Sequence, residues 1–134
     1  MARNMAIRSQ MLTAVAAAVF AFSPVPVQCA STPFNDSAAE PGEWGFRPFE
    51  NRESAVNPPG FVWRPQKNAS AYELQISKEP LFRTLEFSAG GIAYNCFCPD
   101  RPLPKGDYFW RIRFIDPQRG RSNWSKSRSF TIAD

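Results

Sequence analysis

Hydrophobic and polar residues alternate in short segments along most of the chain after residue 60. Alternation with a period of two predicts β-strands that bury one face, and no stretch after residue 30 shows the period of an amphipathic helix. Prolines and glycines separate the segments at intervals typical of turns. The sequence therefore predicts an all-β fold, in the form of an antiparallel sandwich or barrel. The expected strands comprise residues 61–64, 72–76, 81–87, 92–98, 108–115 and 127–132.

The strand expected at residues 108–115 is the longest, and its two faces differ in character. Arg111 and Arg113 alternate with large apolar residues, so they fall on the outward face. The last strand is expected to turn Phe130 and Ile132 inward. The inward face of the long strand, together with Trp63 from the first strand, is expected to form the core with Tyr108, Trp110, Ile112 and Phe114.

The middle of the chain is expected to contain two further strands. Residues 81–87 would place Leu85 and Phe87 inward, and the Gly90-Gly91 pair would then turn the chain. The strand that follows would carry four side chains on one face, namely Ile92, Tyr94, Cys96 and Cys98.

Cys96 and Cys98 are two residues apart. Alternate residues on a strand share a face but lie about 7 Å apart, beyond easy disulfide geometry. Buried free thiols are therefore expected, although pairing stays open in an oxidising compartment. The chain has no histidine, and two thiolates do not complete a tetrahedral shell, so neither a metal nor a cofactor is expected.

The first 30 residues have the pattern of a secretion signal. Arg3 and Arg8 precede an uncharged apolar run over residues 11–22, and small residues around Ala30 suit a signal peptidase. The apolar run is shorter than the roughly 20 residues of a membrane anchor, so no membrane span is expected after cleavage. A buried N-terminal helix and a lipoprotein anchored through Cys29 are the alternatives. We expect export to the periplasm or the medium.

Residues 31–57 are rich in proline and are expected to form a linker that turns into an irregular first strand, with the sandwich over residues 58–134 and the module as a whole over 43–134. Trp44, Phe46 and Phe49 are too aromatic for a free tether. They are expected to contact another domain or to pack on the sandwich's own edge.

The sequence offers no catalytic apparatus. Without histidine, a Gly-x-Ser-x-Gly elbow or a pair of carboxylates enclosed by apolar sequence, we expect no enzyme activity from this chain alone. The formal charge of +4 is dispersed, which favours an acidic polysaccharide over nucleic acid as an anionic partner of an exported chain.

One segment is similar to a known family of sandwiches. Residues 103–113, with the letters LPKGDYFWRIR, resemble the entry to the sixth strand of fibronectin type III domains. The resemblance implies a fibronectin type III/immunoglobulin-like sandwich in which Tyr108 forms a tyrosine corner, its hydroxyl bonding to upstream backbone. Ser122-Asn-Trp124-Ser125 resembles the Trp-Ser motif of the same modules.

Trp124 and three arginines suggest two interpretations. Arg111, Arg113 and Arg128 could flank the indole and grip carboxylate or sulfate groups of a sugar stacked on it. Alternatively, the arginines form a cation–π ladder with Trp124 that stiffens the sheet without a ligand.

The order of motifs over residues 43–132 also resembles the N-terminal domain of heparinase II/III-like polysaccharide lyases. These motifs read NPPxFxW, YxLQxS, GxYxWRxR and SxWS. The resemblance implies a non-catalytic accessory module that packs on a catalytic helical toroid, none of whose catalytic residues has a counterpart here. The alternative is a free-standing module for carbohydrate binding or adhesion, with acidic polysaccharides as its partners.

Overall fold

A computed structural model describes residues 31–133, so the predicted signal peptide lies outside the described residues. The described part of the chain contains eight strands and no helix, which confirms the predicted all-β fold. The strands are β1 (Arg52–Glu53), β2 (Phe61–Val62), β3 (Ala71–Ser77), β4 (Phe87–Ile92), β5 (Cys96–Phe97), β6 (Gly106–Asp116), β7 (Gly120–Arg121) and β8 (Arg128–Ile132).

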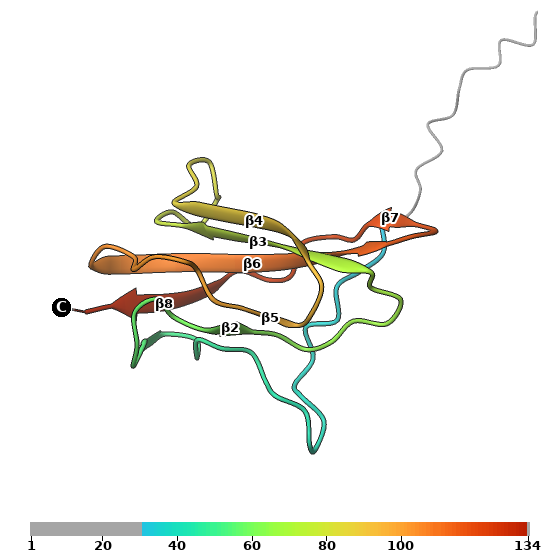
Figure 1. The fold of residues 1–134 in the computed structure, drawn as a ribbon, viewed down its shortest axis with the longest axis horizontal. Coiled ribbons are helices and arrows are strands. Elements are labelled where there is room, and N and C mark those ends of the chain that lie inside the picture. Colours follow the sequence, from blue (N-terminus) through green and yellow to red (C-terminus); the bar gives the residue numbers. More distant parts are fainter. Residues whose placement is uncertain (1–30, 134) are drawn as a thin grey trace, which may run out of the picture.

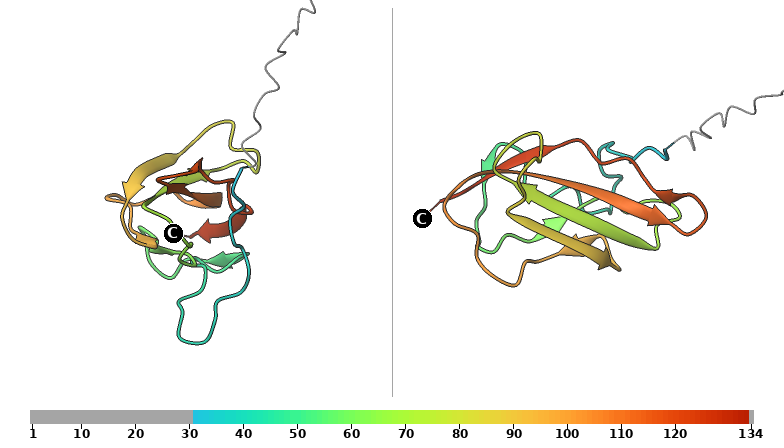
Figure 2. Two further views of the ribbon diagram at one scale, coloured as in Figure 1. Left: turned by 90° about the vertical axis from the view of Figure 1, so that its right-hand side faces the viewer. Right: turned by 90° about the horizontal axis from the view of Figure 1, so that it is seen from above.

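The strands form two layers of a sandwich (Figures 1 and 2). The larger sheet has the order β1-β8-β6-β3-β4, and the short β7 pairs with the end of β6. Its pairings are antiparallel except that β1 runs parallel to β8. The smaller sheet pairs β2 with β5, and a bridge from Arg47 to Val62 extends it on the other side of β2.

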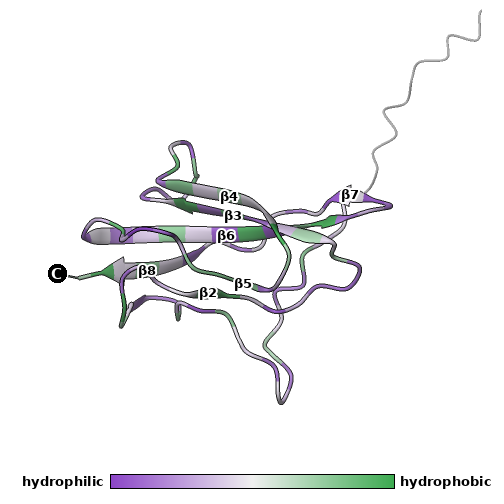
Figure 3. Ribbon diagram, viewed as in Figure 1, coloured by the Kyte–Doolittle hydropathy of each residue, from purple (hydrophilic) through white to green (hydrophobic). Residues whose placement is uncertain are grey.

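The core follows from the alternation along the central strands. Every second residue of β6 from Tyr108 to Phe114 is buried, and Figure 3 shows hydrophobic and hydrophilic positions alternating along this strand. Trp63 and Trp110 are fully buried, as the sequence predicts. Phe61 of the smaller sheet packs edge-on against Trp110 at 5.2 Å and joins the two layers.

Tyr108 forms the predicted tyrosine corner. Its hydroxyl donates a hydrogen bond of 2.5 Å to the carbonyl of Pro104, and its ring stacks on Phe130 at 5.5 Å. Burial, with a smaller contribution from the Glu86 carboxylate, raises the pKa of Tyr108, so the hydroxyl stays protonated and remains a donor. The bond pins the start of β6.

The prediction of a strand over residues 81–87 is wrong. Residues 81–86 form turns and bends, Leu85 is exposed, and β4 begins only at Phe87. Gly90 and Gly91 do not turn the chain but lie within β4, where the register shifts between Tyr72 and Leu74 of β3. Gly91 has a φ of 64°, a left-handed conformation that glycine adopts easily and that β-bulges use.

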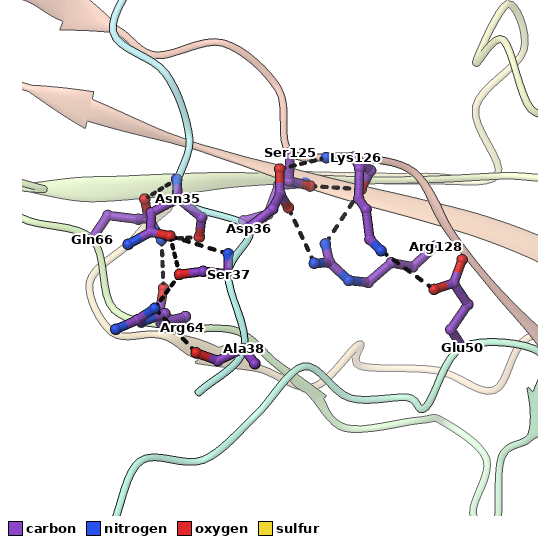
Figure 4. Close-up of polar contacts among 11 residues, drawn as sticks. Asn35, Asp36, Ser37, Ala38, Glu50, Arg64, Gln66, Ser125, Lys126 and Arg128 are labelled. Atoms are coloured by element: carbon purple, nitrogen blue, oxygen red, sulfur yellow. Dashed lines mark hydrogen bonds and ion pairs between the residues drawn. The ribbon is translucent and has the colours of Figure 1, made fainter. Parts of the chain in front are cut away.

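The segment before residue 43 also packs on the sandwich. Phe34 is buried and its ring lies 6.2 Å from that of Phe114. The amide of Asn35 donates to Gln66 Oε1 at 2.8 Å, and Gln66 Nε2 donates back to the Asn35 carbonyl at 3.1 Å (Figure 4). This segment therefore belongs to the core and its polar border.

Candidate functional site

Trp124 lies between two guanidinium groups on the outward face of β6. The guanidinium carbons of Arg111 and Arg113 are 4.3 and 4.2 Å from its ring centre. These two arginines start about 7 Å apart on the same face of the strand, and both guanidinium groups lie against the indole ring. The other side of Arg111 rests on Phe82, whose ring centre is 4.3 Å away.

Two serines hold Trp124 in this position. The amides of Ile112 and Phe114 donate to the hydroxyls of Ser125 and Ser122, each at 3.0 Å. The amides of the same serines donate in return to the Ile112 and Phe114 carbonyls, at 2.7 and 2.8 Å. The Trp-Ser segment therefore runs along β6 like an added strand and points Trp124 at the arginines.

The arginines of this ladder already have polar partners on β3. Arg111 donates through Nε and Nη2 to Gln75 Oε1 at 2.9 and 2.7 Å. Arg113 Nε lies 2.5 Å from Glu73 Oε2, and Arg121 Nε lies 3.1 Å from Glu73 Oε1. The guanidinium groups of Arg111 and Arg113 therefore point toward side chains of β3.

The packing of the ladder shifts the pKa values of two of its charged side chains. Burial, together with repulsion from Arg113, lowers the pKa of Arg111. Burial opposes the ionisation of Glu73, but hydrogen bonds from Arg113 and Arg121 outweigh it and lower the pKa of that carboxyl. The geometry matches the cation–π ladder, in which Trp124 and the two arginines already contact one another.

Arg128 does not belong to this group, which corrects the expected cluster. It pairs with Trp110 in the β6–β8 register and points inward, with 4% of its surface exposed. Its guanidinium carbon lies 3.5 Å from the ring centre of Phe46, and its Nη2 lies 3.1 Å from Asp36 Oδ1 (Figure 4). Burial lowers the pKa of Arg128, although Asp36 opposes the shift.

The three aromatic residues expected to contact another domain divide into two groups. Phe46 is half-buried and packs against the core and against Arg128. Trp44 and Phe49 are exposed by 68% and 54%. Arg47 lies near both, with its guanidinium carbon 5.8 Å from the Trp44 ring centre and 4.7 Å from that of Phe49.

Two hollows of about 290 Å³ each accompany these exposed rings. The first, which we call the Trp44 hollow, is lined by Trp44, Val62, Asn95 and Cys96. The second, the Phe49 hollow, has mostly apolar walls and also contains Glu53. It is lined by Arg47, Pro48, Phe49, Glu53, Ser54, Ala55, Val56 and Gly60.

The cysteines differ from the prediction of burial. Cys96 and Cys98 are unpaired, as expected, but both are exposed. The reason is the inverted face of β5: Phe97 is the residue that packs against the core, 5.8 Å from Phe87, so its neighbours point outward. Tyr94, expected on the inward face, is 75% exposed.

Neither protein-family models nor curated proteins give a match to this chain. Within residues 31–133 no group of three or more metal-ligating side chains comes together. The same residues contain no helix long and apolar enough to cross a membrane.

Arg47, Asn95 and Val56 are the surface residues that the sequence analysis missed. Each lies in an irregular segment or next to a two-residue strand, where no periodicity marks a face. One signal was available: Arg47 is flanked closely by Trp44 and Phe49 in the sequence, and such spacing around an arginine suggests cation–π contacts.

Proposed function

We propose that this chain is an exported, non-catalytic accessory module of a heparinase II/III-like polysaccharide lyase, and that it packs on the helical toroid of that enzyme. The support for the enzyme class is the order of motifs over residues 43–132. The support for a packing role is the Phe49 hollow, because its exposed apolar side chains Phe49 and Val56 form the kind of surface that a partner covers.

The Phe49 hollow has the composition of a contact surface. Phe49 and Val56 are exposed by 54% and 63%, and Pro48 and Ala55 also line the hollow. Arg47 and Glu53 supply charges at its border. An apolar centre with a polar border is the usual anatomy of an interface, and aromatic residues and arginine are its commonest anchors.

The proposed alternative, a free-standing module for acidic polysaccharides, draws no support from the residues first considered for it. The ring of Trp124 is already in contact with Arg111 and Arg113, and Arg128 is buried on the other side of the sheet. We therefore propose the accessory role first.

A binding experiment tests the contact. The toroid domain of a heparinase II/III-like lyase from the same genome, expressed separately, is titrated with the chain in a calorimeter. Phe49→Asp and Val56→Asp should each weaken binding by roughly tenfold or more, about 1.4 kcal/mol. Leu81→Asp, at a 66% exposed apolar residue outside the hollow, is the matched control.

Two results would reject the proposal: no binding of the toroid by the unmodified chain, or equal losses in all three variants. In a parallel assay the chain alone should release no unsaturated uronate from acidic polysaccharides, measured by ultraviolet absorbance. Turnover by the chain alone would contradict the non-catalytic assignment.

A further inference from the structure

The Trp44 hollow lies on the outer side of the smaller sheet. Val62 of β2 pairs with Cys96 of β5, and both line the hollow. Their neighbours Phe61 and Phe97 are directed to the core. Because side chains alternate across a strand, Val62 and Cys96 form an apolar floor beside the exposed indole of Trp44.

Asn95 supplies a fixed polar group at this floor. Its Nδ2 donates a hydrogen bond of 2.9 Å to the carbonyl of Trp63, and the Trp63 amide donates to the Asn95 carbonyl at 3.2 Å. Together these bonds fix the orientation of the Asn95 side-chain amide. Among the described residues Asn95 Oδ1 has no hydrogen-bond donor, so it can accept one from a ligand hydroxyl or amine.

Arg47 supplies an uncompensated positive charge beside Trp44. No carboxylate in residues 31–133 lies within ion-pair distance of its guanidinium, whose contacts are with the Trp44 and Phe49 rings. The acidic residues nearest to Trp44 in sequence are already engaged: Glu40 and Glu43 lie 3.6 and 3.2 Å from Arg64. An anion bound beside Trp44 therefore meets a free cation.

We propose that the Trp44 hollow binds a ring-bearing carboxylate. The ring stacks on the indole above Val62 and Cys96, the carboxylate pairs with Arg47, and a ring hydroxyl donates to Asn95 Oδ1. A hollow of about 290 Å³ is at the lower end of small-molecule sites, which fits one ring and not a long oligomer. Arg47 can take the carboxylate with two parallel N–H donors.

Two sources carry this chemistry: a uronic acid residue of a polysaccharide and a small aromatic acid. Arg47 also lines the Phe49 hollow, whereas Trp44 and Asn95 line only the Trp44 hollow, and the site does not rest on the proposed contact with a toroid. The two proposals have separate tests, so each can fail without the other.

Calorimetric titrations at low salt separate the two sources. One arm compares a hyaluronan tetrasaccharide with the neutral maltotetraose, and the other compares 4-hydroxycinnamate with 4-hydroxycinnamamide. In at least one arm the acid should bind roughly tenfold more tightly than its neutral counterpart. Added salt should reduce this preference, because the arginine is exposed.

Three variants then assign the site. Trp44→Ala should weaken binding of the acid by about tenfold, and Arg47→Gln should abolish the preference for acid over neutral ligand while leaving weak stacking. Phe49→Ala, which removes the other ring beside Arg47, should leave affinity unchanged within about twofold. Because all three side chains are exposed, circular dichroism should show unchanged folding.

The proposal is overturned if neither acid binds more tightly than its neutral counterpart. It is also overturned if Trp44→Ala binds as the unmodified chain does, or if Arg47→Gln keeps the preference. A Trp44→Ala variant that loses toroid binding but has unchanged titrations with both acids would assign the hollow to a protein partner instead.

Discussion

The guanidinium carbon of Arg128 lies 3.5 Å from the ring centre of Phe46. Arg128 is on β8 and Phe46 is in the irregular segment before β1, so this contact joins that segment to the larger sheet. Asp36 neutralises the buried charge at 3.1 Å and also accepts from the Lys126 amide at 3.0 Å (Figure 4).

Asp36→Ala should therefore destabilise the fold, because it leaves the buried guanidinium of Arg128 without a carboxylate. Asp36 retains 29% of its side-chain exposure, so the loss should fall between the roughly 1 kcal/mol of exposed pairs and the roughly 3–5 kcal/mol of fully buried ones. Denaturant unfolding measures it. Glu50→Ala, which breaks the exposed pair with Lys126, is the control and should cost under about 1 kcal/mol.

Trp124→Ala should lower the free energy of unfolding by about 1–3 kcal/mol, because it removes cation–π contacts with both Arg111 and Arg113. Trp44→Ala removes an exposed indole of the same size and should cost less than about 0.5 kcal/mol. Urea titrations of the two variants make the comparison. Equal losses would contradict the structural role of the ladder.

Tyr108→Phe should destabilise the fold by about 0.5–1.5 kcal/mol, the usual net contribution of one hydrogen bond. The change removes only the hydroxyl that donates to Pro104. Tyr94→Phe, at a 75% exposed ring, should leave thermal unfolding unchanged. A stable Tyr108→Phe variant would mean that ring packing alone holds the corner.

Glu73 should make stability depend on pH in the acid range. Its pKa in the folded chain is below the ordinary value, because hydrogen bonds from Arg113 and Arg121 outweigh burial. The carboxylate therefore stabilises the fold above its unfolded pKa, about 4.3, and this stabilisation is lost as the pH falls through the folded pKa. The difference in unfolding free energy between the unmodified chain and Glu73→Gln should shrink on acidification. A constant difference down to about pH 3 would contradict the assignment.

Cys96 and Cys98 should both react with a thiol reagent without denaturant, since both are exposed and unpaired. Intact mass spectrometry of the folded chain, with the single variants Cys96→Ser and Cys98→Ser, counts the modified thiols. Protection of either thiol until the chain unfolds would favour the burial that the sequence suggested.

The alternation along β8 by itself places Arg128 on the inward face of the strand. Phe130 and Ile132 were predicted to face inward, and a period of two places Arg128 on that same side. A charged residue at an inward position needs a partner. That partner, Asp36, is distant in the sequence, and only the folded chain brings it to Arg128.

The sequence by itself determined the class of fold and the long strand β6 with its buried face, and the resemblance to fibronectin type III domains implied the tyrosine corner. These features depend on local alternation and on short motifs, so neighbouring residues suffice to specify them. Tertiary structure alone decided the bulge at Gly90 and Gly91, the outward thiols on β5 and the exposure of Trp44 beside Arg47. Each depends on which distant strand pairs with the segment. A short or irregular segment has no periodicity of its own that determines which of its side chains face the core.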